Sequence, residues 1–193
     1  LRGADDKAGI AEILTAIEYL VKHPELKHGK IEVILSPDEE TGHGMDHVPS
    51  DLVTSRRAYT VDGGHAGEIE TECFNAYGTS VEFTGKAAHT GDARAHCTVN
   101  AISTACAFVN SLPASQRPET TDGREGFFAP MEITGTIEKA QVSLLLRDFT
   151  EDGMKKRKAL VEQLASSAAA SFGAEVKVTH KQLYLNMKQN LDK

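Results

Sequence analysis

The hydrophobic residues at the start of the chain follow the spacing of one face of an α-helix. From Ala8 onward they recur every three or four positions, and Pro24 ends the pattern. The residues expected on the inward face are Ile10, Ile13, Leu14, Ile17, Leu20 and Val21. Two short apolar runs follow at 31–35 and 58–61, and such runs are typical of strands buried on both faces of a parallel sheet. A helix followed by buried strands predicts the α/β class for residues 1–74.

After about residue 74 the pattern changes to alternating strands and amphipathic helices. Strands are predicted at 77–84, 131–137, 141–148 and 174–180, and helices from Thr98 to Leu112 and from Thr150 to Phe172. The positions expected to face inward on the first of these helices are Val99, Ile102, Cys106 and Val109. We expect Gly173 to end the second helix.

The order strand–helix–strand–strand–helix–strand is that of a split βαβ sandwich, in which two helices cover one face of an antiparallel sheet. This α+β unit is complete in itself, whereas the α/β portion before it is not. The expected organisation is therefore a partial α/β domain over 1–74, an inserted βαββαβ domain over 75–184, and the start of a return to the first domain over 185–193.

Composition and charge exclude several kinds of partner. The chain has 193 residues, of which 40% are hydrophobic and 25% charged, as is ordinary for a globular protein. Its net charge of -7 argues against nucleic acid or an anionic membrane as the main partner. No apolar stretch approaches the roughly 20 residues that span a bilayer. The three cysteines, an odd count without a CxxC pair, indicate reduced thiols and a cytoplasmic location.

Acidic residues stand directly at the ends of the elements predicted for the first domain. Glu39 and Glu40 follow the first apolar run, Asp62 follows the second, and Asp5 lies at the start of the first helix. In open α/β sheets, ligands bind beyond the carboxyl ends of the strands. Carboxylates alone suit magnesium or calcium, whereas added imidazole shifts the preference toward zinc, cobalt or manganese. Of two adjacent glutamates, one could bind a metal ion while the other serves as general base.

Each of these motifs has a simpler interpretation when it is taken alone. A glutamate pair after a strand is most often a solvated turn. Asp5 and Asp6 could cap the helix and favour its dipole. The sequence DGG from Asp62 could be a tight turn, and His65 beyond it is more typical of a solvated loop than of a metal ligand. Taken together, at the ends of the predicted elements, the acidic motifs favour a metal site.

In their order, these motifs resemble those of a known enzyme family. GADDKAG (3–9), PDEETG (37–42) and YTVDGG (59–64) resemble the di-zinc exopeptidases, a family that includes aminoacylases and carboxypeptidase G. Within it the chain is most similar to the aminotripeptidases, and the similarity extends over essentially the whole chain through FNAYGTSVEFTGKAAHTG, VNAIS, PETTDGREGF, LLRDF and YLNM. The resemblance implies a zinc-dependent enzyme, with two zinc ions per active site, that removes the N-terminal residue from tripeptides.

The resemblance also assigns roles to individual residues. It implies that Asp5 bridges the two metal ions, that Glu40 and Asp62 each bind one of them, and that Glu39 is the general base. The peptide bond between Asp5 and Asp6 would be cis. The inserted βαββαβ unit would be the family's lid and dimerisation domain, which implies a possible homodimer.

Three residues of the inserted unit would contact a short peptide substrate. The resemblance implies that His89 helps to hold the substrate carbonyl oxygen, that Asn100 contacts the substrate, and that Arg147 grips the terminal carboxylate. A guanidinium binds a carboxylate bidentately, which agrees with the last role. Arg147 alternates with inward-facing positions of its strand, so it should project from the face opposite the helices. Taken alone, all three could be surface or helix-terminus residues.

Two histidine ligands of the family's metal site have no counterpart in this sequence. One belongs to a His-x-Asp motif that precedes GADDKAG, and the other lies near the family's C-terminus. Three carboxylates cannot complete two roughly four-coordinate zinc sites. We therefore expect an internal fragment that binds zinc weakly and hydrolyses no peptide alone. Two alternatives stay open: a non-catalytic product that retains only the association surface of the lid, and a dipeptidase or aminoacylase of the same fold.

Overall fold

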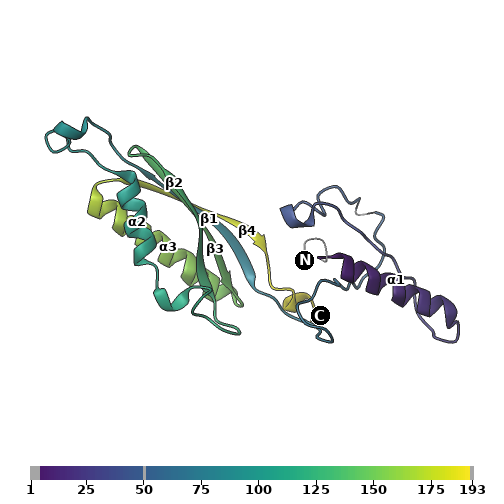
Figure 1. Ribbon diagram of the computed structural model, residues 1–193. Helices are drawn as coiled ribbons and strands as arrows, with labels where there is room; N and C mark the ends of the chain where they lie inside the picture. Colours follow the sequence, from purple (N-terminus) through teal and green to yellow (C-terminus); the bar gives the residue numbers. More distant parts are fainter. Residues whose placement is uncertain (1–4, 50, 192–193) are drawn as a thin grey trace. The chain divides into compact units, whose positions relative to one another are not determined.

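The computed structural model describes residues 5–49 and 51–191, which form two compact units divided between Glu70 and Thr71 (Figure 1). Each unit is described by itself. No helix among the described residues has both the length and the hydropathy needed to cross a bilayer.

The first unit contains the expected helix, α1 (Lys7–Lys22). Its start is fixed by Asp6, whose side chain accepts a hydrogen bond from the backbone N–H of Gly9 at 2.9 Å. The helix ends just before Pro24, as predicted. Its apolar stripe is only partly covered, because Leu14 and Val21 are exposed.

The two apolar runs at 31–35 and 58–61 form no strand in the described residues, so this prediction is wrong. A parallel strand is stable only beside a hydrogen-bonded neighbour, and no ladder of the described residues includes either run. One side chain, Glu32, joins the first run to a distant segment. Its carboxylate accepts hydrogen bonds from the backbone amides of Thr54 and Ser55 at 3.1 and 2.8 Å, and from the ammonium of Lys30 at 2.6 Å. These donors, Lys30 foremost, hold the pKa of the Glu32 carboxyl below its usual range.

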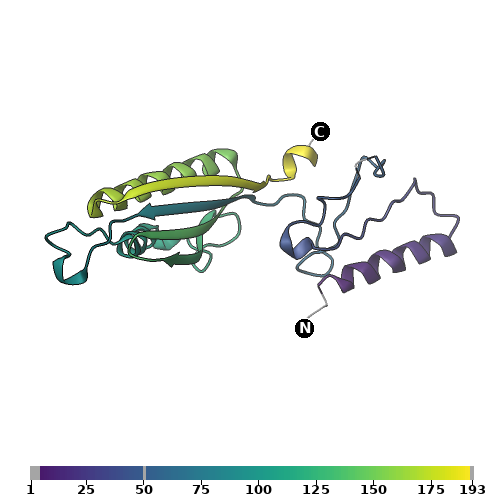
Figure 2. The same cartoon turned by 90° about the horizontal axis from the view of Figure 1, so that it is seen from above.

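The second unit has the predicted order of elements. They are β1 (Asn75–Thr84), α2 (Ala101–Ser111), β2 (Phe127–Gly135), β3 (Lys139–Asp148), α3 (Glu151–Phe172), β4 (Glu175–Tyr184) and a short terminal helix α4 (Lys188–Leu191). The four strands form one antiparallel sheet in the order β2-β3-β1-β4. Both long helices cover the same face of this sheet (Figures 1 and 2). The βαββαβ prediction is confirmed, and with it the α/β fold class.

The core of the second unit lies between the sheet and the two helices. On β3 the residues facing the helices alternate with partly exposed ones, as a half-buried strand requires. Phe83 of β1 and Phe108 of α2 are fully buried at its centre, with their ring centroids 5.8 Å apart. The cluster also includes Val81, Phe128, Val142, Leu144, Leu146, Met154 and Val161.

The inward face of α2 differs from the predicted one. The buried residues are Ala101, Thr104, Ala105 and Phe108, whereas Ile102 and Cys106 are exposed. The alanines let the helix lie close to the sheet, and Phe108 fills the space at its centre. Of the positions expected to face inward, Val109 packs against the core. The helix is capped by Asn100, not by Thr98, and the Asn100 Oδ1 accepts from the amides of Ile102 and Ser103 at 2.9 and 3.2 Å.

The predicted limits of α3 are confirmed. The Thr150 hydroxyl accepts from the Gly153 N–H at 3.0 Å, and Gly173 ends the helix in the left-handed conformation, with φ of 73°. Phe172, the last residue of the helix, is 42% exposed.

One histidine lies in the seam between α3 and the edge strand β4. His180 Nδ1 is hydrogen-bonded to the Thr79 hydroxyl at 2.7 Å, and its Nε2 lies 3.3 Å from the Glu162 carboxylate. Burial lowers the pKa of His180; Glu162 opposes this shift and Lys158 adds to it.

A histidine with a lowered pKa makes the second unit less stable in acid. The unfolded chain then binds a proton more readily than the folded one, so the free energy of unfolding falls as the pH drops below about 6.5, the ordinary histidine value. We expect this loss in urea denaturation between about pH 7.5 and about pH 5. His180→Gln should reduce it, and His96→Gln, at an exposed loop position, should not. An equal pH dependence in all three proteins would contradict the assignment.

Candidate metal centre and substrate contacts

Three carboxylates converge where α1 begins. Oxygen atoms of Asp5, Asp6 and Asp62 all lie within 4.8 Å of one another, and all three residues are exposed. Asp5 and Asp6 come from the turn before the helix, and Asp62 from the end of the second apolar run. The structure thus brings together two of the three predicted metal ligands and adds Asp6.

Gly9 permits this convergence. It is the buried residue of α1, and a Cβ at this position would collide with the carbonyl oxygen of Val61 and with the Asp6 carboxylate. The first turn of the helix can therefore lie directly against the Val61 backbone, which places Asp62 beside Asp5.

The negative charges of the clustered carboxylates repel one another. Partial desolvation, and then the negative charges of Asp5, Asp6 and Glu39, raise the pKa of the Asp62 carboxyl. A bound cation would relieve this repulsion, and clustered carboxylate oxygens are the donors that hard divalent ions prefer. The described residues therefore fit a metal ion, although they offer oxygen ligands only.

Glu39 and Glu40 lie in a short 3₁₀ turn, Glu39–Thr41, that follows the first apolar run. Asp38 before it and Gly42 after it have positive φ, of 61° and 75°, so the chain folds back sharply at this point. Glu39 lies within electrostatic range of Asp62, whereas Glu40 is not among the clustered carboxylates. Their roles as general base and metal ligand stay predictions.

Two further predictions concern this region. The peptide bond between Asp5 and Asp6 is cis, as the resemblance implies. His65 is exposed and lies outside the carboxylate cluster, in agreement with a loop histidine.

His89 and Asn100 lie at one end of the second unit. Both belong to the connection between β1 and α2 (residues 85–100), in which the backbones of Lys86 and Val99 pair. His89 begins a 3₁₀ turn, and its Nδ1 accepts from the Gly91 N–H at 3.2 Å. The Asn100 Oδ1 is occupied in capping α2, which leaves the amide NH₂ group of the side chain as the polar group that could contact a substrate.

Arg147 lies at the opposite end, near the close of β3. Its guanidinium carbon is 5.8 Å from the ring centroid of Phe74 and 6.0 Å from that of Tyr184, and its buried Nε has no hydrogen-bond partner among the described residues. Leu146, its neighbour, is buried against the helices, so Arg147 belongs to the other face of the sheet, as predicted.

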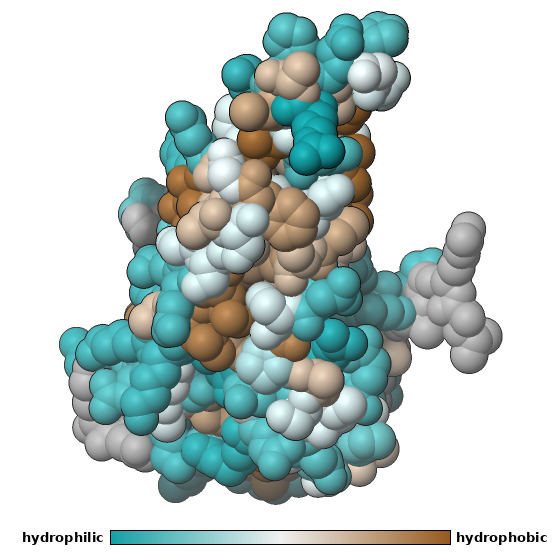
Figure 3. All heavy atoms as spheres, turned by 90° about the vertical axis from the view of Figure 1, so that its left-hand side faces the viewer, coloured by the Kyte–Doolittle hydropathy of each residue, from teal (hydrophilic) through white to brown (hydrophobic). Residues whose placement is uncertain are grey.

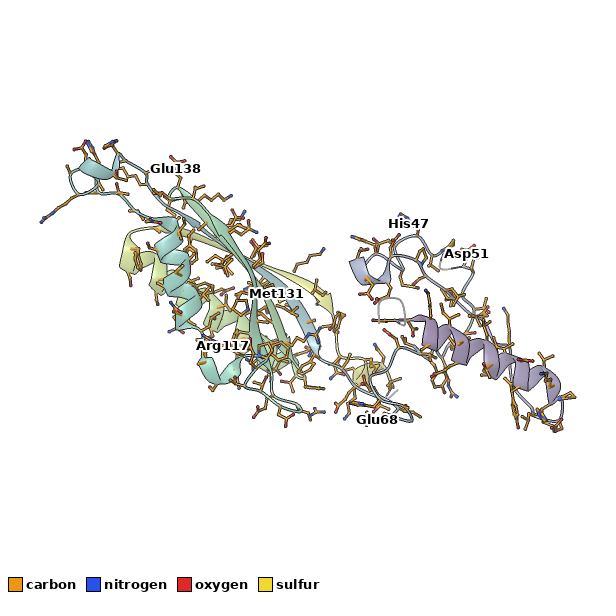
Figure 4. All side chains as sticks on the ribbon, viewed as in Figure 1. His47, Asp51, Glu68, Arg117, Met131 and Glu138 are labelled. Carbon is orange, nitrogen blue, oxygen red and sulfur yellow. The ribbon has the colours of Figure 1, made fainter. Side chains whose placement is uncertain are left out.

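The separation of these ends follows from the register of the sheet. Arg147 pairs with Ala76, and Lys139 pairs with Thr84, eight residues further along β1. At about 3.3 Å per residue the two ends are about 25 Å apart, while an extended tripeptide spans about 10 Å. The loop that carries His89 starts beside Glu138 (labelled in Figure 4), since the Gly85 N–H donates to the Glu138 carbonyl at 2.7 Å. One tripeptide therefore cannot contact His89 and Arg147 of the same copy.

The sequence matches known proteins along its full length. Residues 71–172 match the peptidase dimerisation domain of the M20 family. A protein named peptidase T from Clostridium perfringens (strain SM101 / Type A) is 46% identical over 193 residues, which are 100% of this chain and 47% of the relative. One from Streptococcus gordonii is 47% identical over 194 residues, with the same coverage. The chain spans about half the length of the curated relatives it matches.

Solved structures of peptidases superpose on this chain over most of its length. The aminopeptidase PepT from Bacillus cereus superposes with a TM-score of 0.75 at 26% identity, covering 96% of this chain and 50% of that one. A tripeptidase from Staphylococcus aureus superposes with a TM-score of 0.79 at 21% identity, covering 95% and 49%. At that identity the second match concerns the fold alone.

Proposed function

Since the chain belongs to the M20 peptidase family, we propose that the protein carrying it is a metal-dependent aminopeptidase that removes the N-terminal residue from tripeptides. The observation that carries this proposal is the convergence of Asp5, Asp6 and Asp62 at one point. The names of two kinds of relative, peptidase T and aminopeptidase PepT, support an aminopeptidase. Tripeptides as substrates follow from the resemblance of the sequence motifs to those of the aminotripeptidases.

In this proposal Asp5, Asp62 and Glu40 would hold the metal ions, with Asp5 as the ligand that the two ions share. When bound, the metal ions activate water and polarise the scissile carbonyl. Glu39 accepts the proton of the attacking water and passes it to the leaving amine. His89 stabilises the carbonyl oxygen as negative charge develops on it, Asn100 contacts the substrate, and Arg147 holds the terminal carboxylate.

The donor set limits what these residues do alone. Zinc sites in proteins generally include nitrogen or sulfur ligands, and the clustered donors here are all oxygen. We therefore expect the 193-residue chain to bind zinc weakly and to hydrolyse no peptide. The complete core of its second unit supports a second candidate for the chain by itself, a non-catalytic polypeptide that retains an association surface. The three free thiols support a cytoplasmic location.

A homodimer through the second unit is part of the proposal. Of the two edge strands, β4 carries Lys177 and Lys181, which discourage edge pairing, whereas β2 has Glu132 as its one charged residue. Met131 and Ile133 of β2 are 66% and 48% exposed, and they line a 330 Å³ groove against α2. Apolar surface is exposed on the side that faces left in Figure 1, as Figure 3 shows. We assign the exposed edge of β2 to the contact with a second copy of the chain.

A dimer would also bring His89 and Arg147 of different copies close together. Antiparallel pairing of two β2 edges about a twofold axis brings the His89 end of one copy beside the Arg147 end of the other. A single tripeptide could then be held by Arg147 of one copy and by His89 of its partner.

The activity can be tested in a chimera in which this chain replaces the matching residues of the Clostridium perfringens peptidase T (hereafter the chimera). We expect the chimera to release alanine from trialanine, to lose this activity to a chelator and to regain it with zinc. Dialanine and N-acetylalanine are the matched test substrates for a dipeptidase and an aminoacylase. A folded, zinc-loaded chimera that cleaves either of these faster than trialanine would contradict the tripeptidase proposal.

Mixing two inactive variants tests the shared site. His89→Ala and Arg147→Ala chimeras should each be impaired, but a heterodimer of the two has one intact site, formed by Arg147 of one copy and His89 of the other. Random exchange of subunits should restore about a quarter of the wild-type rate. Two variants of the same residue, His89→Ala and His89→Gln, serve as the control mixture. If the mixed His89 and Arg147 variants recover no more activity than the control, each site uses residues of one copy only.

A further inference from the structure

Two sequence motifs that the proposed mechanism does not use meet at one point of the second unit. FNAYG contributes Asn75 at the start of β1, and YLNM contributes Asn186 just beyond β4. Their exposed fractions are 1% and 6%. The Asn186 backbone N–H donates to the Asn75 Oδ1 at 2.9 Å, so the two residues are joined directly.

Both side-chain amides donate to the backbone that follows Arg147. The Asn75 Nδ2 donates to the Asp148 carbonyl at 3.1 Å, and the Asn186 Nδ2 donates to the Phe149 carbonyl at 3.1 Å. The Asn186 Oδ1 also accepts from the backbone amides of Cys73 and Lys188, at 3.2 and 3.0 Å. If either side chain moved, a buried polar group would lose its hydrogen-bond partner, which is energetically costly. The hydrogen bonds therefore favour this one arrangement of the two asparagines.

The two rings that flank the Arg147 guanidinium are close to the two asparagines in the sequence. Phe74, one flanking ring, precedes Asn75 in the chain, and Tyr184, the other ring, lies two residues before Asn186. On the far side of the same backbone, the Asp148 carboxylate is bound by the Arg157 Nε at 2.9 Å. Arg147 itself forms no ion pair among the described residues, so the backbone and the two rings hold it in place.

We propose that Asn75 and Asn186 are positioning residues for Arg147. By fixing the carbonyls of Asp148 and Phe149, they align the end of β3 with the two flanking rings, and this places the Arg147 guanidinium where it can bind an incoming carboxylate. This inference rests on the proposed function in one respect, the role of Arg147 as the group that binds the terminal carboxylate of the substrate.

The kinetic test compares trialanine with trialanine amide in the chimera. Asn186→Ala should raise KM for trialanine about tenfold while kcat and the KM for the amide stay close to wild type, as expected when a charge-assisted contact is misaligned. In an Arg147→Ala background the same change should have no further effect on the preference for acid over amide. Asn75→Ala should behave as Asn186→Ala does.

A matched control separates positioning from stability. Thr104 is equally buried but lies in α2, where its hydroxyl donates to the Asn100 carbonyl at 3.0 Å. Thr104→Val should lower the urea midpoint and leave the preference for acid over amide unchanged. If Asn186→Ala lowers the midpoint but leaves this preference unchanged too, the pair is structural and the proposal is overturned.

A second readout on the 193-residue chain keeps the two proposals distinguishable. Hydrogen exchange of the Arg147 Nε–H and of the backbone amides of 147–149 should be faster in Asn186→Ala than in Thr104→Val. If the Arg147→Ala chimera prefers trialanine over its amide as strongly as the wild type does, Arg147 does not bind the terminal carboxylate. The exchange result then still decides whether the two asparagines hold residues 147–149 in place. Equal exchange in the two variants would overturn the positioning role whatever the kinetics show.

Discussion

Replacing Glu39 by Gln should lower kcat of the chimera for trialanine by about 10²–10⁴-fold, the usual contribution of a general base. The substitution keeps the size of the side chain and its place in the Glu39–Thr41 turn but removes the group that accepts the proton of water. Because the proposal assigns the metal ion to Glu40 and only the proton transfer to Glu39, the zinc content should stay at the wild-type value.

Glu12→Gln, at an exposed position of α1, is the matched control and should leave kcat unchanged. The measurement is steady-state kinetics together with zinc analysis of the same preparations. A Glu39→Gln chimera that keeps its zinc and retains more than about a tenth of wild-type kcat would remove Glu39 from the mechanism.

Replacing Phe108 by Ala should lower the free energy of unfolding of the second unit by about 3–5 kcal/mol. The ring is fully buried and lies 5.8 Å from that of Phe83, between α2 and the sheet, so its removal leaves a cavity that the sheet cannot close. Small residues surround it on the helix, and no other large side chain of α2 is fully buried.

Urea denaturation of the 193-residue chain measures this effect. Phe172→Ala, at a position that is 42% exposed, is the matched control and should lower the free energy of unfolding by less than about 1 kcal/mol. Similar losses for the two variants would mean that the core does not lie between α2 and the sheet.

The elements of the second unit could be read from the sequence because local and long-range preferences agree there. Strand alternation, the Thr150 cap and the Gly173 stop all specify the observed βαββαβ order. The inward stripe of α2 could not be read in this way. Hydrophobicity favoured Ile102 and Cys106, but the distance to the sheet selected Ala101 and Ala105.

The strands predicted in the first unit show a different limit. An apolar run specifies that a segment prefers burial, but a strand also needs a neighbour with which to form hydrogen bonds. For the runs at 31–35 and 58–61 the described residues provide no such ladder, and the one strong link is the Glu32 carboxylate.

The candidate site was predictable in its types of residue and less so in its arrangement. Asp5 and Asp62 were expected to meet because acidic residues at element ends converge in α/β folds, and they do. The inclusion of Asp6 depends on the local turn. The distance between His89 and Arg147 depends on the register of β1 with β3. The contact between Asn75 and Asn186 depends on the register of β1 with β4. A single sequence indicates neither register.

The location of zinc in crystals of the chimera, measured by anomalous diffraction at the zinc edge, shows whether the acidic residues of the first unit hold the metal ions. We predict two zinc ions, with Asp5 bound to both, Asp62 bound to one and Glu40 bound to the other, at zinc–oxygen distances of about 2.0–2.2 Å. Zinc bound elsewhere, with neither Asp5 nor Asp62 among its ligands, would mean that these carboxylates do not form the metal site.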